Sequence, residues 1–273
     1  MTLSGAISIK SATKVYDPDG ARVLALDNCS MEIGPGEFSV VVGPSGCGKT
    51  TLLNAIAGFH ALTGGEIFLD GQLLSSQEKP ARPGADRIVV FQNGALFPWL
   101  TILENITFGP LAQKKLDPAA AKARALELLE TMGLAGIALD YPGQVSSGMR
   151  RRAEIARAMI NSPKVLLLDE PFRALDALTK TVAHQFLLEV YDRTRPTVFF
   201  ITHDLDEAIF LASKVYIMTT RPATVKLVLD INLPRPRDFR LLASRDYQRL
   251  REKCREAVRT EALKAFSAGE REM

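Results

Sequence analysis

The strongest indication of the fold comes from residues 38–58, FSVVVGPSGCGKTTLLNAIAG. Its centre fits the pattern G-x-x-x-x-G-K-[ST], with the apolar run Phe38–Val42 before it and the helical pattern Thr51–Gly58 after it. In this context the glycines let backbone N–H groups converge on phosphate oxygens, and the new helix presents its positive end to them. The sequence therefore predicts a phosphate-binding loop within an α/β core.

The residues of this loop have separate predicted roles. Lys49 is expected to reach the β- and γ-phosphates of a nucleotide, and Thr50 to supply an oxygen to Mg²⁺. Cys47 is interpreted as a small filler rather than a redox switch. The alternative, a glycine-rich turn that binds nothing, is disfavoured because strand, loop, Lys-Thr pair and helix all occur in order. The predicted nucleotide contacts are Gly43, Pro44, Ser45, Gly46, Cys47, Gly48, Lys49, Thr50 and Thr51.

A pair of acids follows a second apolar strand pattern, Val165–Leu168. Asp169 is suited to hold Mg²⁺ through water, and Glu170 is suited to polarise an attacking water. Two acids at a strand end also fit a solvated cap, although the phosphate loop makes that alternative less attractive. Because kinases, GTPases and motor ATPases share such a loop, these two motifs alone do not name a reaction.

The overall composition excludes several classes of protein. The chain has 273 residues, and 34 basic against 31 acidic side chains leave a formal net charge of +3. Nucleic acid is therefore not expected as a partner, since binding to its backbone rests on concentrated Lys and Arg. Three dispersed cysteines predict neither a disulfide framework nor a zinc site and fit a reducing cytoplasm. No apolar run approaches the roughly 18 residues that span a bilayer, so membrane association is expected only through a partner.

Strand and helix patterns alternate along the chain and favour an α/β fold with a largely parallel sheet. The segment Ile7–Ile33 differs, because a turn signal at residues 17–20 divides it, and it is interpreted as an antiparallel β layer. Strand patterns are absent from Thr101–Pro163, which predicts a helical lobe inserted into the core. The strand patterns assigned to the parallel sheet are Phe38–Val42, Arg87–Phe91, Val165–Leu168, Thr197–Thr202 and Lys214–Met218.

Capping signals mark the helices of this lobe. Thr101 with Glu104 predicts a capping box, Asp117 followed by Pro118 predicts an N-cap with a first-turn proline, and Gly133 predicts a helix end.

The segment Ser244–Phe266 has a helical apolar stripe, which is expected to pack against the core. The stripe consists of Tyr247, Leu250, Cys254, Val258 and Phe266.

Between the two phosphate motifs lies Val145-Ser146-Ser147-Gly148-Met149-Arg150, followed by a helical pattern. This segment resembles the signature motif of ABC ATPases, usually written L-S-G-G-Q, and it lies just upstream of the acidic strand as the family requires. Further landmarks of the family follow in order over residues 7–220. They are Tyr16 as the aromatic that stacks on adenine, Gln92 after a strand, Ala174-Leu175-Asp176 after Glu170, and His203 after another strand.

The resemblance implies a P-loop NTPase core with an antiparallel β subdomain and an α-helical subdomain inserted at about residues 97–163. This ABC ATPase domain spans residues 1–220, and a C-terminal strand and helix extension spans residues 221–273. ATP and Mg²⁺ are the implied cofactors. By resemblance, Glu170 is the general base, Gln92 senses Mg²⁺ and water, and His203 contacts the γ-phosphate. Thr50, Gln92 and Asp169 are the implied metal-site residues.

The resemblance also implies a dimer. In the family, the signature serine and nearby backbone N–H groups at a helix N-terminus complete the ATP pocket of the opposite subunit. Ser146 and Gly148 would thus contact the partner's γ-phosphate, and Ser147 and Asp176 are assigned to the same shared nucleotide site. Two nucleotides are then buried head to tail between two copies of the chain.

Two residues depart from the family pattern. Ser147 replaces the first glycine of the signature, where a Cβ restricts the backbone, and Arg173 stands where a serine is usual. These departures bear on the rate of turnover more than on ATP binding. Met149, in place of glutamine, is frequent in one importer subgroup.

Residues 89–101 resemble the corresponding region of ATPases from nitrate, sulfonate and taurine importers. In that group the segment contacts a permease helix, and exposed Phe97 and Trp99 suit such docking, although both also suit the junction between core and lobe. The implied partners are a second ATPase subunit, membrane permease subunits and, indirectly, a solute-binding protein. The implied location is peripheral, at the cytoplasmic face of the inner membrane.

Two other functions remain open from the sequence. A soluble ABC-type ATPase that acts on nucleic acid is one, although no coiled-coil insertion, zinc module or tandem cassette appears. Its one tight basic cluster, Arg150-Arg151-Arg152, is expected near phosphate or at an interface. A P-loop kinase is the other, and it is distinguished by transfer of phosphate to a small molecule instead of water.

Overall fold

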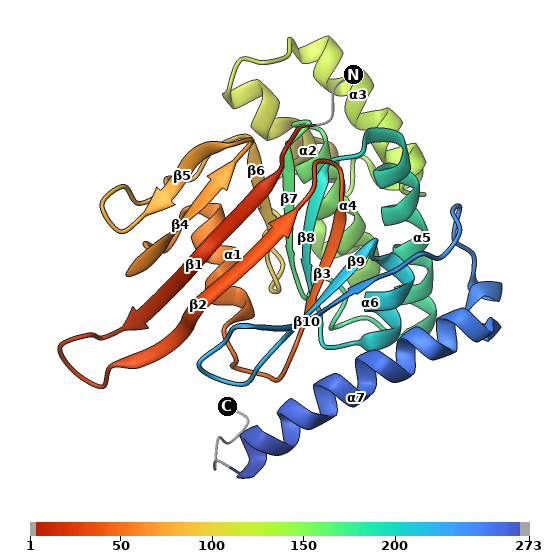
Figure 1. The fold of residues 1–273 in the computed structure, drawn as a ribbon. Coiled ribbons are helices and arrows are strands. Elements are labelled where there is room, and N and C mark those ends of the chain that lie inside the picture. The colour runs from red at the N-terminus through yellow and green to blue at the C-terminus, as the bar shows by residue number, and fades with distance from the viewer. Residues whose placement is uncertain (1–3, 268–273) are drawn as a thin grey trace.

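Two sheets form the framework of the computed structural model, which describes residues 4–267 (Figure 1). One has the strand order β2-β1-β4-β5 and is antiparallel throughout. The other has the order β10-β9-β3-β8-β7-β6 and is parallel except for β10. The strands are β1 Ile7–Tyr16, β2 Val23–Ile33, β3 Phe38–Val42, β4 Gly64–Leu69, β5 Gln72–Ser76, β6 Arg87–Val90, β7 Val165–Asp169, β8 Thr197–Ile201, β9 Lys214–Met218 and β10 Val225–Asp230.

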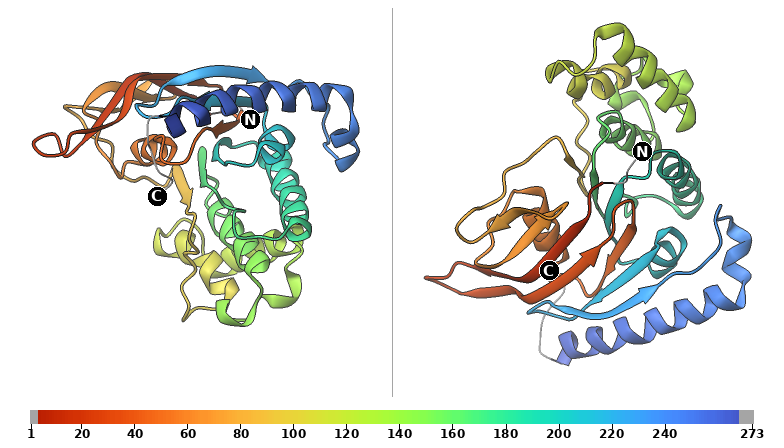
Figure 2. Two further views of the ribbon diagram at one scale, coloured as in Figure 1. Left: turned by 90° about the horizontal axis from the view of Figure 1, so that it is seen from below. Right: turned by 45° about the horizontal axis from the view of Figure 1, so that its top comes forward.

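Helices cover the parallel sheet and extend beyond it (Figure 2). Among the described residues, no helix is long and apolar enough to cross a membrane. The α-helices are α1 Lys49–Ala57, α2 Ile102–Ala112, α3 Pro118–Thr131, α4 Ser147–Met159, α5 Ala177–Thr194, α6 Leu205–Leu211 and α7 Arg245–Ser267. The 3-10 helices are η1 Ala135–Ile137, η2 Pro142–Gln144 and η3 Phe239–Ala243.

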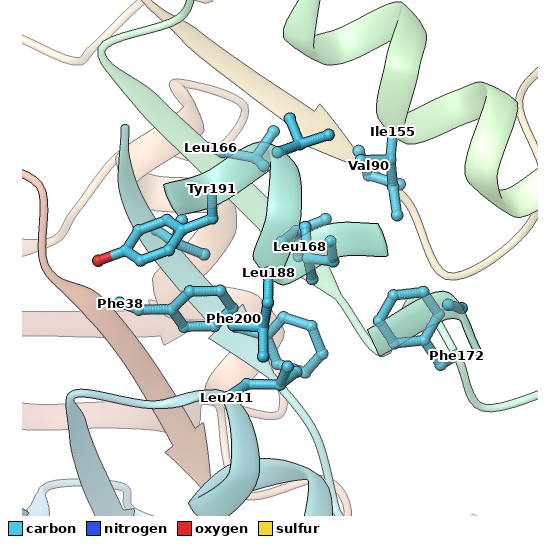
Figure 3. Packing of buried hydrophobic residues seen from close by; sticks show 14 of the residues in the cluster. Phe38, Val90, Ile155, Leu166, Leu168, Phe172, Leu188, Tyr191, Phe200 and Leu211 are labelled. Atoms are coloured by element: carbon cyan, nitrogen blue, oxygen red, sulfur yellow. The ribbon is translucent and has the colours of Figure 1, made fainter. Parts of the chain in front are cut away.

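The buried strands of the parallel sheet supply side chains to two separate cores. Side chains alternate along a strand, so Val40 and Val41 of β3 point to opposite faces. Val41 packs with α1 and the antiparallel sheet, whereas Val40 packs with Phe200 and the helices beyond it. Figure 3 shows part of this second core, with Phe38 and Tyr191 close to Phe200. Burial on both faces explains why these strands read as continuous apolar runs.

The predicted secondary structure is largely confirmed. The five strand patterns assigned to the parallel sheet are β3 and β6 to β9, and residues 7–33 form the antiparallel pair β1–β2. Within residues 101–163, all of which the structure describes, the regular elements are helices. The division into domains at residue 220 stays a prediction.

The predicted caps of the helical segment are present. The Thr101 side chain accepts from Glu104 N, and the Glu104 side chain accepts from Thr101 N. Asp117 caps α3 with Pro118 in its first turn. Gly133 follows α3 with a φ of 63°, a left-handed value that glycine adopts without strain.

One part of the C-terminal prediction is wrong. Tyr247 and Cys254 of α7 are buried, but Phe266 is 84% exposed. The position that continues the inward row is Glu261, seven residues after Cys254, and it is buried. Five residues further along an α-helix is a rotation of about 140° from that row, so Phe266 faces away from the core.

Candidate nucleotide site

The predicted site residues converge because their strands are parallel neighbours. β3 pairs with β8, β8 with β7 and β7 with β6, all in parallel register. The carboxyl ends of parallel strands meet at one edge of a sheet, which is where such folds bind ligands. The loops that follow these four strands carry Lys49, His203, Glu170 and Gln92.

The phosphate loop turns from β3 into α1 through backbone that needs glycine. Gly46 has a φ of 71° and Gly48 a φ of 124°. A Cβ at Gly48 would stand 2.8 Å from Ala25 O, so a side chain there would displace backbone. Lys49 is buried, and its Nζ donates to Gly43 O at 2.9 Å and to Pro44 O at 2.8 Å. Carbonyl groups of the loop therefore surround the Lys49 ammonium group.

Thr50 and Asp169 bring oxygen atoms together at the base of this loop. Thr50 Oγ1 lies 3.1 Å from Asp169 Oδ2. Burial raises the pKa of Asp169, against the opposing effect of the Thr50 hydrogen bond. A hydroxyl and a carboxylate are the oxygen ligands that Mg²⁺ prefers, and a divalent cation there would offset the cost of the buried charge. These residues fit the predicted metal.

Glu170 and His203 lie beside each other at the adjoining strand ends. His203 Nδ1 is 3.4 Å from Glu170 Oε2. Arg173 Nη1 is 3.3 Å from the same oxygen, although the Arg173 side chain is 60% exposed. Arg173, which replaces the usual serine, thus contacts the predicted general base directly.

Tyr16 faces the start of α1. Its hydroxyl lies 3.3 Å from Thr51 Oγ1 and 2.9 Å from His60 Nδ1. Lys14 Nζ stands 5.0 Å from the centre of the Tyr16 ring. This arrangement connects the first strand with the helix of the phosphate loop, next to the predicted position of the nucleotide.

The signature residues stand at the N-terminus of α4, where Ser146 and Ser147 are exposed and Gly148 is buried. Ser146 caps this helix by accepting from Met149 N at 3.3 Å. A Cβ at Gly148 would lie 2.3 Å from Thr179 Cγ2, so glycine allows α4 to approach α5 closely. Asp176 caps α5 by accepting from Leu178 N and Thr179 N. Within the described residues, no hydrogen bond joins Ser146 to the phosphate loop.

The arginines of the basic cluster on α4 make hydrogen bonds within the chain, and the expected phosphate or interface role stays a prediction. Arg151 donates to Phe91 O and Gln92 O and pairs with Glu154 at 2.6 Å. Glu154 also accepts from Ala95 N at 2.8 Å. This buried pair fixes the backbone around Gln92, while the Gln92 side chain is exposed.

The two neighbours of Arg151 are likewise used within the chain. Arg150 donates to Pro142 O and Val145 O, and Arg152 donates to Met132 O. The spacing of Arg151 and Glu154, three residues apart on one helix, was the available sequence signal for the buried pair.

Comparison with known proteins gives consistent matches. The family model described as ABC transporter matches residues 26–173. The nitrate import ATP-binding protein NrtD of Synechocystis sp. is 42% identical over 84% of this chain and 83% of its own length. The aliphatic sulfonates import ATP-binding protein SsuB of Bacillus cereus is 39% identical over 90% of this chain and 93% of its own.

A solved structure agrees with these sequence relatives. It is the dimeric post-hydrolysis state of the ATP-binding cassette MJ0796 bound to ADP and Pi. The TM-score is 0.71 at 31% identity, with 84% of this chain and 100% of that chain covered. Together with the phosphate loop and the paired acids, these matches identify the chain as a member of the ABC transporter family, an ATP-binding and ATP-hydrolysing subunit of the importer type.

Proposed function

We propose that two copies of this chain close over two ATP molecules and that their hydrolysis drives uptake of a small oxyanion-bearing or nitrogenous solute through a separate permease. The observation that carries this proposal is the division of the site. Lys49, Thr50 and Glu170 lie at the sheet edge, whereas Ser146 is exposed at the start of α4 without a hydrogen bond to that edge in the described chain. A second copy supplies the missing side.

The chemistry follows from positioning and charge, as phosphoryl transfer generally does. Lys49 holds the β- and γ-phosphates, and Glu170 orients and deprotonates the attacking water. His203 contacts the γ-phosphate from the neighbouring strand end. Its closeness to Glu170, 3.4 Å, supports action on the same phosphate group.

Mg²⁺ is the proposed metal, which Thr50, Asp169 and Gln92 would hold. It supplies neutralisation of phosphate charge when bound. The oxygen donors 3.1 Å apart and the buried carboxylate support this assignment. Gln92 reaches the same edge because β6 runs parallel to β7.

The proposed permease contact is an apolar cavity of about 660 Å³ between the core and the helical segment. Its lining includes Phe59, Phe91, Phe97 and Phe108. The neighbouring Trp99 is 70% exposed, as the docking hypothesis expects. Phe97 is less exposed than that hypothesis expects, because it is half-buried and stacks on Trp99. An aromatic-lined hollow suits a short helix from another protein.

The solute class rests on the named relatives, which import nitrate and aliphatic sulfonates. A peripheral position at the cytoplasmic face of the membrane and an indirect role for a solute-binding protein complete the proposal. Uptake of nitrate, taurine and alkanesulfonates by cells with and without the gene tests the solute. Equal uptake of every such anion in both strains contradicts this part of the proposal.

The shared site is tested with Glu170→Gln, which keeps the shape of the side chain but removes the base. Saturating Mg-ATP is expected to produce a stable dimer in sedimentation experiments, with hydrolysis lost. Glu189→Gln, an exposed substitution on α5, is the matched control and should hydrolyse ATP normally. A Glu170→Gln chain that binds ATP yet stays monomeric would contradict the shared site.

A further inference from the structure

The loop that carries His203 rests on a polar cluster, which we define as Thr202, Glu207 and His184. Thr202 Oγ1 donates to Glu207 Oε2, and Glu207 Oε1 lies 2.7 Å from His184 Nε2. The Thr202 hydroxyl oxygen also accepts from Asp204 N at 3.0 Å. Hydrogen bonds therefore fix both residues that flank His203.

The cluster is buried, although the histidine that it flanks is not. Thr202, Glu207 and His184 are each at most 6% exposed, whereas the His203 side chain is 53% exposed. A buried polar group is costly to leave without a partner, so a cluster whose members satisfy one another favours a single arrangement. The position of His203 is thus set by its neighbours in the chain more than by packing around its ring.

The cluster also reaches the loop of Glu170. The His184 ring meets Phe172 edge-on, with ring centres 5.1 Å apart. Phe172 lies two residues after Glu170 and is fully buried in the core shown in Figure 3. Lys180, one turn before His184 on α5, donates to Asp204 Oδ2 at 2.9 Å. One helix therefore supports both catalytic loops.

We propose that Thr202, Glu207 and His184 are positioning residues that hold His203 against Glu170 and thereby set the kcat of ATP hydrolysis. This inference rests on the proposed role of His203 at the γ-phosphate. The cluster acts through the backbone of the loop and is not itself in contact with the nucleotide. It is separate from the phosphate loop, where ATP affinity is determined by Lys49.

The first test compares Thr202→Val with Thr202→Ser. Valine keeps the shape of threonine but leaves Glu207 Oε2 and Asp204 N without their hydroxyl partner, whereas serine keeps that partner. A misplacement of about 1 Å costs up to about 100-fold in rate, so we expect kcat of Thr202→Val to fall about tenfold or more. The KM for ATP should stay within about twofold, and Thr202→Ser should recover most of the rate, because it retains the hydrogen-bonding hydroxyl.

The second test places Thr202→Val in a His203→Ala background. If the cluster acts through His203, adding Thr202→Val to His203→Ala should lower kcat little further, because the effects of residues that act as one unit are not additive. The same loss of kcat with and without His203 would overturn the proposal. Should Thr202→Val fail to fold, Glu207→Gln replaces it, since an amide cannot accept from both partners as the carboxylate does.

Different outcomes test the role of His203 and the role of the cluster. A normal kcat in His203→Ala alone would contradict the role of His203 itself. A lost kcat in His203→Ala, together with normal rates in Thr202→Val and Glu207→Gln, would contradict only the positioning role. Glu189→Gln, which changes an exposed carboxylate paired with Arg193, controls for a general effect of removing one polar partner and should leave kcat unchanged.

Discussion

The starts of α1 and α4 are both proposed to hold ATP phosphates, yet the two helix ends are built differently. At α1, Lys49 is buried, and its ammonium group is enclosed by carbonyls of its own loop. At α4, Ser146 is exposed, and the donor to its hydroxyl oxygen within residues 4–267 is Met149 N of its own helix. In the proposed mechanism, the first is an anion site within one chain. The second would become a site when another copy of the chain covers it.

If two copies share the nucleotides as proposed, this contrast couples dimerisation to ATP binding. A helix N-terminus attracts anions through its unpaired N–H groups and its dipole, but an exposed one competes with water. When a second copy brings the triphosphate to α4, water is excluded and the same groups interact more strongly. Substitutions at α1 should therefore affect ATP binding by the single chain, whereas those at α4 should affect closure of the pair.

The largest expected effect is that of Lys49→Ala. Removing a charged donor aimed at the transferred phosphate costs about 100-fold or more in kcat/KM, and ATP binding should be lost as well. Titration with a fluorescent ATP analogue and release of inorganic phosphate measure both. Lys115→Ala, an exposed lysine after α2, is the control. Retained hydrolysis in Lys49→Ala would remove the phosphate loop from the site.

Ser146→Ala tests the exposed start of α4. ATP binding by the single chain is expected to stay within about twofold, because no hydrogen bond joins Ser146 to the phosphate loop in the described residues. Hydrolysis should fall about tenfold, since one phosphate contact is lost on closure. Loss of the cap adds about 1 kcal/mol of helix destabilisation, which a melting curve measures separately.

Ser147→Gly is the companion variant at the same helix end. Ser147 is exposed in the first turn of α4, so glycine removes a side chain without opening a cavity. ATP affinity should be unchanged and hydrolysis equal or higher. A large loss of activity would show that the signature loop does not approach phosphate as proposed.

Sequence motifs predicted the parts of the site that are local. The glycines around Lys49, the acids after β7 and the caps of α2 and α3 depend on residues a few positions apart, and each can be recognised from spacing alone. Parallel strand patterns then place the loops at one edge. The roles of these residues at the nucleotide stay predictions, although their positions agree with the motif.

Long-range pairing of polar groups could not be predicted in the same way. Glu207 meets His184 across 23 positions, and Arg151 holds Gln92 across 59. Charged side chains on a helix are predicted to face solvent, because the sequence pattern does not show which other elements cover them. The same reason explains α7, where the buried Glu261 continues the inward row and the apolar Phe266 does not.

Glu261→Gln tests whether α7 stabilises the chain beside the phosphate loop at the start of α1. Glu261 accepts from Thr220 N, and Ala223 in the same loop packs beside Gly48. Burial acts to raise the pKa of Glu261, but hydrogen bonds from Lys264, Lys226 and Thr220 together lower it to about 2. After allowance for solvent screening, the variant should lose on the order of 1 kcal/mol of folding free energy at neutral pH.

The pH dependence gives the sign of this effect. A carboxyl whose folded pKa is depressed stabilises the fold above its unfolded pKa, and the stabilisation is lost as pH falls from 4.5 towards 2. The difference between wild type and Glu261→Gln should therefore be full at pH 7 and shrink below pH 4.5. Denaturation by urea at several pH values measures it. A difference that grows on acidification would contradict the ionised, paired state of Glu261.

A modest gain in rate is expected of Arg173→Ser, which restores the residue usual in the family. Arg173 competes with His203 for one oxygen of Glu170, but an ion pair with one exposed partner is worth at most about 1 kcal/mol. Releasing Glu170 should raise kcat by about two- to fivefold. The gain should shrink at high salt, because ions screen the wild-type pair as well. Arg193→Ser, which breaks an exposed pair on α5, should change neither kcat nor its salt dependence. A fall in kcat would instead mean that the Arg173 guanidinium assists the reaction. Arg173 would then be a catalytic cation that the family motifs, which have serine at this position, did not predict.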